Sequence, residues 1–285
     1  MSYDHRSNAG NEGDVLKHAI LAALVQDLLP TSGDRVFRYA EAHAGRGRSL
    51  LLAGGAWERG IGRLGTTASW PASRPLAPYR ENCLFGKSDG AATTGDSYLG
   101  SAALVLRLLE RHGVAYQLYL FETDAAAARD LCAYVAAHAV HPANVTVFDG
   151  DGYEGVKGLS GLDLALVDPP TRDEERVEDF LRTPPHGLKN LLVWTPRSCA
   201  GSGDSGNPLP GRESKASREW LASLRDLPSA LPQKRMERAA WDGWAGSTRD
   251  LAGCAVAGWF SATSTHGAMG SGAAATRALM AWPED

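Results

Sequence analysis

Long apolar runs are absent from this 285-residue sequence, and no segment approaches the roughly 18 consecutive apolar residues that a membrane-spanning helix needs. The opening residues MSYDHRSNAGNEGD have neither the charged region nor the apolar region of a secretory signal peptide. The four cysteines, Cys83, Cys132, Cys199 and Cys254, form no CxxC pair, which argues for a reduced environment and against a structural zinc site. We therefore expect a cytoplasmic protein that does not associate with membranes.

An excess of basic charge is also absent, because 29 Lys and Arg face 33 Asp and Glu and the formal net charge is −4. Proteins that bind nucleic acid are usually basic, since they neutralise phosphates. The charge is nevertheless uneven: residues 35–90 hold nine Lys or Arg against four acids, a local net charge of +5 (9 − 4). Residues 171–179 (TRDEERVED) reverse the sign, with five acids against two arginines. Composition alone therefore leaves nucleic-acid binding open.

Motifs for metal-dependent or serine-dependent catalysis are weak. The spacing of His5, His18 and His43 fits no standard set of metal ligands, so we expect no metal site. Residues 203–206 (GDSG) resemble a serine-protease nucleophile segment and His138 its histidine, but His138 lies in an alanine-rich helical run. Triads are recognised by geometry and not by local strings, so a serine hydrolase is disfavoured.

Short apolar segments alternate with helical ones along much of the chain. Leu16, Ile20, Leu24 and Leu28 recur every fourth residue and predict a helix over residues 11–29, with Asn11 as its N-cap. Further helices are expected over 104–109 and 125–138, and strands over 36–42, 117–122, 145–148, 164–167, 188–195 and 251–260. This alternation predicts an α/β fold with a mostly parallel, doubly wound sheet.

The strand 164–167 (LALV) is followed directly by Asp168, Pro169 and Pro170. A short continuous apolar run is typical of a strand buried on both faces. Proline cannot donate to a sheet ladder, so the strand must end here. Asp168 is therefore predicted at the carboxyl end of a central strand, where open α/β sheets bind their ligands.

Other polar or glycine-rich groups follow the neighbouring strands: residues 41–47 (EAHAGRG, including Gly45), Glu122, and Asp151 with Gly152. Glycines allow close backbone approach, an acid after the second strand suits ribose hydroxyls, and Asp151 suits an adenine amino group. The set predicts a nucleoside cofactor across the sheet edge. The AGRG turn at residues 44–47 is shorter than GxGxxG, and GxxxxGK[ST] is absent, so a pyrophosphate cradle is not indicated. S-adenosylmethionine, which has no phosphate, matches.

Several motifs resemble the ribosomal RNA large-subunit methyltransferase J family. The most specific are residues 2–5 (SYDH) and 9–18 (AGNEGDVLKH), and the similarity continues through residues 43–45, 100–101, 122, 151–152, 168–170 and the Trp194-x-Pro196 segment. The resemblance implies a Rossmann-like class I fold and methylation of N6 of an adenine in 23S rRNA, which would be the RNA partner. Asp-Pro-Pro followed by an aromatic residue is, more broadly, the signature of amino-group methyltransferases.

The resemblance also implies roles for individual residues. His18, His43, Ser101, Glu122, Asp151 and Gly152 would contact S-adenosylmethionine, with Gly45 at the close backbone approach. Asp168, Pro169 and Pro170 would form the catalytic motif. Tyr3, His5, Lys17, Thr171 and Trp194 would lie at the substrate side of the site. One domain is expected over residues 1–285, with 11–29 as a lid helix over the cofactor and 53–98 as an inserted segment facing the substrate.

Asp-Pro-Pro suits methylation of an amino group for a physical reason. The lone pair of an adenine amino nitrogen is delocalised into the ring, which makes the nitrogen a poor nucleophile. The Asp168 carboxylate and the Pro169 carbonyl can each accept one N–H and hold the nitrogen toward tetrahedral geometry, with its lone pair aimed at the sulfonium methyl. Proton loss to Asp168 can follow the transfer.

Two positions depart from the family pattern. Thr171 stands where an aromatic residue stacks on the flipped base, and Asn8 stands where the family has histidine. Either Trp194 or Tyr3 replaces the missing aromatic, or the methyl acceptor is a small amine or amide and not RNA. A binding protein without catalytic activity is a third reading. Residues 198–216, rich in Gly, Ser and Pro, are expected to be mobile.

Overall fold

The computed structural model describes residues 5–29, 35–64, 77–86, 92–169, 173–196, 235–240 and 254–260. Its helices are α1 (His5–Asn8), α2 (Glu12–Leu28), α3 (Ala77–Arg80), α4 (Ser101–Arg111), α5 (Ala125–His138), α6 (Gly152–Lys157) and α7 (Glu174–Arg182). Its strands are β1 (Phe37–Glu41), β2 (Arg48–Leu50), β3 (Leu84–Phe85), β4 (Ser97–Leu99), β5 (Tyr116–Glu122), β6 (Val145–Asp149), β7 (Leu164–Val167), β8 (Asn190–Pro196), β9 (Arg235–Ala240) and β10 (Cys254–Phe260). Short 3-10 turns lie at Ala56–Glu58, Ile61–Leu64 and Pro142–Asn144.

Seven strands form the main sheet in the order β6-β5-β1-β7-β8-β10-β9. The strands from β6 to β8 run parallel to one another, whereas β10 is antiparallel to both of its neighbours, β8 and β9. The predicted mostly parallel sheet is therefore confirmed. The antiparallel direction of β10 and the presence of β9 were not predicted, because the polar sequence of β9 (RMERAA) has no apolar alternation.

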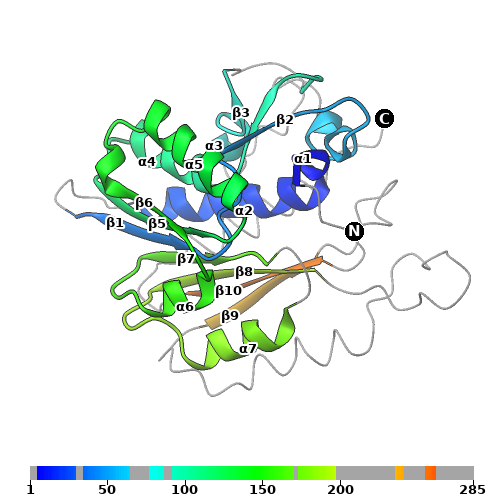
Figure 1. The fold of residues 1–285 in the computed structure, drawn as a ribbon. Coiled ribbons are helices and arrows are strands. Elements are labelled where there is room, and N and C mark those ends of the chain that lie inside the picture. Colours follow the sequence, from blue (N-terminus) through cyan, green and yellow to red (C-terminus); the bar gives the residue numbers. More distant parts are fainter. Residues whose placement is uncertain are drawn as a thin grey trace, which may run out of the picture.

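Helices cover both faces of this sheet, with α2, α4 and α5 on one side and α6 and α7 on the other (Figure 1). The side chains of β7 alternate between the two cores: Leu164 and Leu166 pack on the side of α2, and Ala165 and Val167 on the side of α7. This alternation is the two-residue period of a strand. It explains why all four residues of LALV are fully buried.

The boundaries of several predicted elements shift in the structure. Helix α4 starts at Ser101, with Gly100 at its N-cap, and extends to Arg111 beyond the predicted 104–109. Strand β8 begins at Asn190 and not at 188, and β10 begins at Cys254 and not at 251. The helix 125–138 and the strand 164–167 have the predicted bounds.

A second, three-stranded antiparallel sheet in the order β2-β4-β3 lies above α4 and α5 in Figure 1. Its strands bracket most of the segment 53–98, which was predicted as an insertion. The expected mobile residues 198–216 lie outside the described part of the chain. In that described part, no helix is both long enough and apolar enough to span a membrane.

Candidate active site at the carboxyl edge of the sheet

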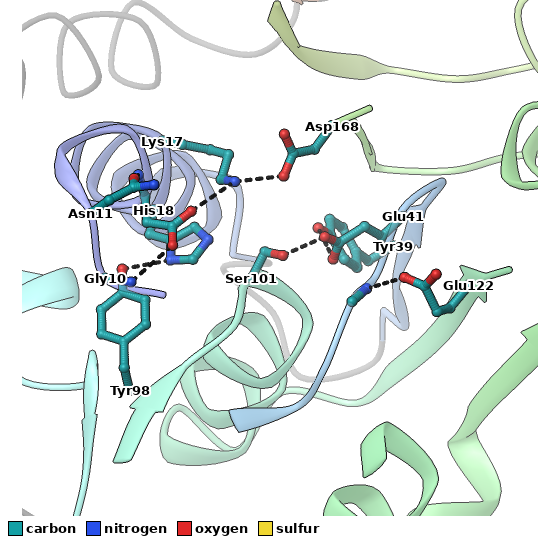
Figure 2. Close-up of polar contacts among 12 residues, drawn as sticks. Gly10, Asn11, Lys17, His18, Tyr39, Glu41, Tyr98, Ser101, Glu122 and Asp168 are labelled. Atoms are coloured by element: carbon teal, nitrogen blue, oxygen red, sulfur yellow. Dashed lines mark hydrogen bonds and ion pairs between the residues drawn. The ribbon is translucent and has the colours of Figure 1, made fainter. Parts of the chain in front are cut away.

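Asp168 follows β7 at the carboxyl edge of the main sheet and meets the N-terminal helix α2. Its Oδ2 atom lies 2.5 Å from Nζ of Lys17, and the same Nζ lies 3.1 Å from Oδ1 of Asp14 (Figure 2). The side chains of Lys17 and Asp168 are 9% and 16% exposed, respectively. The structure thus brings together Lys17 and Asp168, two residues that were expected near the active site.

The start of α2 is arranged so that Lys17 faces the sheet edge. The Asn11 side chain caps the helix by accepting a hydrogen bond from the backbone N–H of Asp14 at 2.8 Å. The Asp14 side chain in turn accepts one from the N–H of Gly10 at 3.0 Å, where Gly10 has a positive φ of 73°. These bonds fix Asp14 beside Lys17. Burial alone would lower the pKa of Lys17, but the carboxylates of Asp168 and Asp14 outweigh burial and raise that pKa well above its usual range.

His18, the next residue of α2, faces the inserted segment. Its Nδ1 atom lies 2.8 Å from the hydroxyl of Tyr98 on β4, and the two rings are stacked at 5.6 Å. Burial and the neighbouring Lys17 charge lower the pKa of His18 to about 3, so the ring is neutral.

Glu41, at the end of β1, is a fully buried carboxyl that the sequence analysis left without a role. It accepts hydrogen bonds from the Ser101 hydroxyl and, at 2.9 Å, from the Tyr39 hydroxyl. Burial raises the pKa of Glu41 to about 8, despite these two donors. An acid that ends a buried strand beside a Gly-rich turn was the available signal. Ser101, a predicted cofactor residue, is therefore held by Glu41 (Figure 2).

Glu122, at the end of β5, connects two neighbouring strand ends. Its Oε2 atom accepts a hydrogen bond from the N–H of Gly45 at 2.7 Å, and its Oε1 atom accepts one from the N–H of Asp124 at 2.8 Å. Gly45 has a φ of 59°, and a side chain there would meet only open space. The turn after β1 is thereby fixed beside Glu122, as a close backbone approach to a ligand requires.

His43 lies in the same turn with its Nδ1 atom buried and without a hydrogen-bond partner in the described part of the chain. Its ring packs edge-on against Tyr153 at 5.0 Å. Burial lowers the pKa of His43 to about 4, which leaves the imidazole neutral. A buried polar atom without a partner is uncommon and calls for an explanation such as a ligand.

Asp151 already has structural partners. It caps α6 by accepting hydrogen bonds from the N–H groups of Tyr153 and Glu154 at 3.0 and 3.2 Å. Its other oxygen lies 2.5 Å from Nη2 of Arg176 on α7. Its neighbour Gly152 packs so closely that a Cβ there would lie 1.7 Å from the carbonyl oxygen of Ala42. Capping explains Asp151 without any ligand, so its predicted cofactor role stays a prediction.

The remaining predicted residues are placed less directly. Pro169 is buried after Asp168, whereas Tyr3, Pro170 and Thr171 lie outside the described residues. The backbone of His5 belongs to α1, but its side chain is not described. Trp194 is 8% exposed and part of the core, with Lys17 Nζ 5.8 Å from its ring. The ring of Trp194 is thus covered by the same lysine that pairs with Asp168.

Two relatives of this chain both bear the name ribosomal RNA large subunit methyltransferase J. The chain is 26% identical over 204 residues to a ribosomal RNA large subunit methyltransferase J from Haemophilus influenzae, with 68% of each chain covered. It is 28% identical over 180 residues to the Escherichia coli K12 protein of that name, covering 60% of this chain and 59% of the relative. The resemblance to the ribosomal RNA large-subunit methyltransferase J family is confirmed. No protein-family model matches the chain.

A solved structure supports the fold. A Legionella pneumophila protein superposes with a TM-score of 0.60 at 20% identity, covering 88% of this chain and 86% of that one. The predicted Rossmann-like class I methyltransferase fold is confirmed by this topology and by the relatives. The segments that carry the methyltransferase J motifs, around α2 and the ends of β1, β5 and β7, are also those that converge at the edge in Figure 2.

Proposed function

We propose that this chain is an S-adenosylmethionine-dependent methyltransferase that methylates ribosomal RNA, with N6 of an adenine in 23S rRNA as the acceptor. The observation that carries the proposal is the position of Asp168. It stands at the end of the central strand β7, between α2 and the ends of β1 and β5, and it is paired with Lys17. Both curated relatives bear the name of a ribosomal RNA methyltransferase.

The residues around this edge fit S-adenosylmethionine. Glu122 has the position of an acid that accepts from ribose hydroxyls, the Gly45 turn leaves open space, and His43 offers a buried nitrogen without a partner in the described residues. The cofactor would supply an electrophilic methyl group on a sulfonium. Glu122 and the turn after β1 would hold its nucleoside, and His18 and Ser101 its amino-acid end.

Asp168 and Pro169 would orient the acceptor. The Asp168 carboxylate and the Pro169 carbonyl would each accept one N–H of the amino group, so that the nitrogen lone pair points away from both of them. Pro169 is buried and rigid, which restricts the motion of this pair of acceptors. After transfer, the carboxylate of Asp168 would receive the proton that the nitrogen loses.

Lys17 would hold the Asp168 carboxylate in place. The Lys17 side chain is 9% exposed and contacts both Asp14 and Asp168, so the position of its ammonium group is fixed. An opposite charge at 2.5 Å favours the carboxylate form of an acid. In the carboxylate form both oxygens of an acid act only as acceptors.

The domain assignment is part of the proposal. Residues 1–285 would form one methyltransferase domain, with α2 as a lid over the cofactor and residues 53–98 facing the substrate. A small amine or amide acceptor was the alternative, and neither the relatives nor the geometry favours it. Thr171 stands at the position of the family's aromatic residue. Methyl transfer to RNA in the experiments below would show that the base is recognised without an aromatic side chain at this position.

The decisive experiment measures methyl transfer from labelled S-adenosylmethionine to protein-free 23S rRNA and to a panel of small amines. We expect transfer to the RNA, with binding that weakens steeply as salt rises. Asp168→Ala should lower the transfer rate by about 10²–10³-fold, the range found when a single group that stabilises the transition state is removed. S-adenosylhomocysteine should still bind to that variant.

Asp179→Ala is the matched control, because it removes an exposed carboxylate on α7. This helix lies on the face of the sheet opposite to α2. Its transfer rate should equal that of the unmodified protein. Wild-type turnover in Asp168→Ala would overturn the proposed mechanism. Methylation confined to a small amine would overturn the proposed substrate and leave the cofactor assignment standing.

A further inference from the structure

Two tyrosines of the segment between β2 and α4 form a buried chain of hydroxyls that ends at His18. The Tyr79 hydroxyl on α3 lies 3.2 Å from the Tyr98 hydroxyl on β4, which lies 2.8 Å from Nδ1 of His18 on α2. The exposed fractions of Tyr79, Tyr98 and His18 are 0%, 2% and 3%. Three elements that are distant in sequence therefore meet in one hydrogen-bonded chain.

The chemistry of these groups decides the direction of the hydrogen bonds. A neutral imidazole nitrogen is a stronger base than a phenol oxygen, and a phenol is a stronger acid than a neutral imidazole N–H. Tyr98 therefore donates to Nδ1 of His18. Its oxygen is then free to accept from Tyr79, which strengthens the bond to the histidine. Because His18 is neutral, its single ring proton must be on Nε2.

The Nε2 atom is the nitrogen of His18 that remains for a ligand. Among the described residues, the structure gives it no hydrogen-bond partner, whereas Nδ1 is occupied by Tyr98. In Figure 2, His18 and Glu122 lie on opposite sides of the pair formed by Ser101 and Glu41. A cofactor whose ribose is bound by Glu122 and whose methyl faces Asp168 would thus extend its amino-acid end toward His18.

We infer that Tyr98, supported by Tyr79, is a positioning residue that fixes His18 as a hydrogen-bond donor at Nε2 toward the carboxylate of the cofactor's amino-acid end. The inference rests on the proposed function, because it requires that end of S-adenosylmethionine at α2. A donor at Nε2 complements a carboxylate and not the adjacent ammonium group. The segment 53–98 would then contribute to cofactor affinity through Tyr79 and Tyr98.

Binding of S-adenosylhomocysteine to the full chain, measured by calorimetry, tests this role. Tyr98→Phe should weaken binding roughly tenfold and Tyr79→Phe roughly threefold, as expected for hydrogen bonds that orient a donor to a charged group. The KM for S-adenosylmethionine should rise by a similar factor in Tyr98→Phe, while kcat changes little. His18→Ala should bind weakly as well, and adding Tyr98→Phe to it should cause no further loss.

Tyr116→Phe is the matched control. Tyr116 is 2% exposed, and its hydroxyl donates to Glu110 at 2.7 Å, at the start of β5 and away from the carboxyl edge. Like Tyr98→Phe, this variant loses one tyrosine hydroxyl that makes a hydrogen bond. If both variants bind S-adenosylhomocysteine equally weakly, the loss of affinity comes from general destabilisation, and the inference is overturned. Unchanged affinity for S-adenosylhomocysteine in both Tyr98→Phe and Tyr79→Phe would also overturn it.

Nitrogen NMR of the unmodified, histidine-labelled protein tests the proton position directly. We expect His18, identified by the signal missing from His18→Ala, to carry its proton on Nε2 with Nδ1 as an acceptor. A proton on Nδ1 would overturn the inference, even if Tyr98→Phe fails to fold. If the unmodified protein binds no S-adenosylhomocysteine, the proposed function fails and the cofactor role of Tyr98 fails with it. The NMR result would still decide whether the hydroxyl chain orders His18.

Discussion

Burial perturbs one of the acids at the ends of neighbouring strands. Glu41 has no exposed surface, and its pKa is raised to about 8, because a charged carboxylate is poorly solvated there. Asp168, one strand away, has the Lys17 ammonium at 2.5 Å. A neutral Glu41 can hold Ser101, whereas Asp168 is paired with a cation. The edge therefore contains two carboxyl groups in different electrostatic surroundings.

The raised pKa of Glu41 predicts a pH dependence of stability. The folded-state value of about 8 lies above the ordinary value of 4.5, so the stabilisation from protonated Glu41 is complete below about pH 4.5 and is lost as pH rises toward 8. Glu41→Gln mimics the protonated form and lacks this loss. Urea unfolding at several pH values should show the unmodified protein losing stability relative to Glu41→Gln between pH 5 and pH 8.

Glu175→Gln, which changes an exposed carboxyl on α7, serves as the control for that comparison. Its stability curve should run parallel to that of the unmodified protein across the same range. Parallel curves for Glu41→Gln would instead mean that Glu41 is charged in the folded protein. Ser101 would then donate to a charged carboxylate and not to a neutral acid.

At the scale of the element, the start of α6 joins a helix cap to the predicted adenine site. Asp151 caps the helix, and its carboxylate also pairs with Arg176. Asp151→Ser keeps a capping oxygen and should retain the free energy of unfolding within about 0.5 kcal/mol, whereas Asp151→Ala should lose about 1 kcal/mol. Both variants remove the charge, so both should bind S-adenosylhomocysteine roughly tenfold more weakly if Asp151 accepts from the adenine amino group.

Denaturation and calorimetry on the same samples separate the two roles of Asp151. Normal affinity in Asp151→Ser combined with a stability loss in Asp151→Ala would assign this residue to capping alone. The predicted cofactor contact would then be wrong. Reduced affinity in the serine variant, with stability preserved, would support the contact.

The packing of α6 against the turn after β1 depends on Gly152. A Cβ at this position would lie 1.7 Å from the Ala42 carbonyl oxygen, which is backbone and cannot rotate away. Gly152→Ala should therefore cost about 3 kcal/mol of unfolding free energy, the upper range for overpacking. Gly158→Ala, at the end of the same helix, meets its nearest atom at 3.5 Å and should be neutral or slightly stabilising. Equal unfolding midpoints for the two variants would contradict this packing.

At the scale of the whole molecule, the ends of β1, β5 and β7 and the start of α2 belong to parts of the chain that only the fold brings together. A ligand that bridges them stabilises the folded state by mass action. S-adenosylhomocysteine at 100 times its Kd should add about 2.7 kcal/mol to the free energy of unfolding and raise the Tm by a few degrees. NAD is a suitable control, because the turn after β1 (AGRG, residues 44–47) is shorter than the GxGxxG of a dinucleotide site.

Calorimetry and thermal unfolding measure this effect without any methyl acceptor. An absence of both heat and thermal shift with S-adenosylhomocysteine would remove the basis for the cofactor assignment, whatever the RNA does. A shift with NAD of the same size would indicate a nucleotide site of broader specificity. The experiment thus tests the site as an assembly of separate elements.

The sequence by itself determined the local features of this protein. The alternation of strands and helices, the end of β7 at Asp168 and the cap at Asn11 follow from neighbours in the chain, because apolar periodicity, proline and capping act over a few residues. The motifs at the strand ends were visible for the same reason, and the order of a parallel sheet places them at one edge.

Only the tertiary structure decided which groups touch and what charge they carry. Lys17 meets Asp168 across 151 positions and Tyr98 meets His18 across 80, distances over which no local pattern operates. Desolvation of Glu41 depends on everything packed around it, and the direction of β10 depends on the strands it joins. Long-range contacts and burial are properties of the whole fold, so protonation and hydrogen-bond direction at this site could not be obtained from sequence patterns.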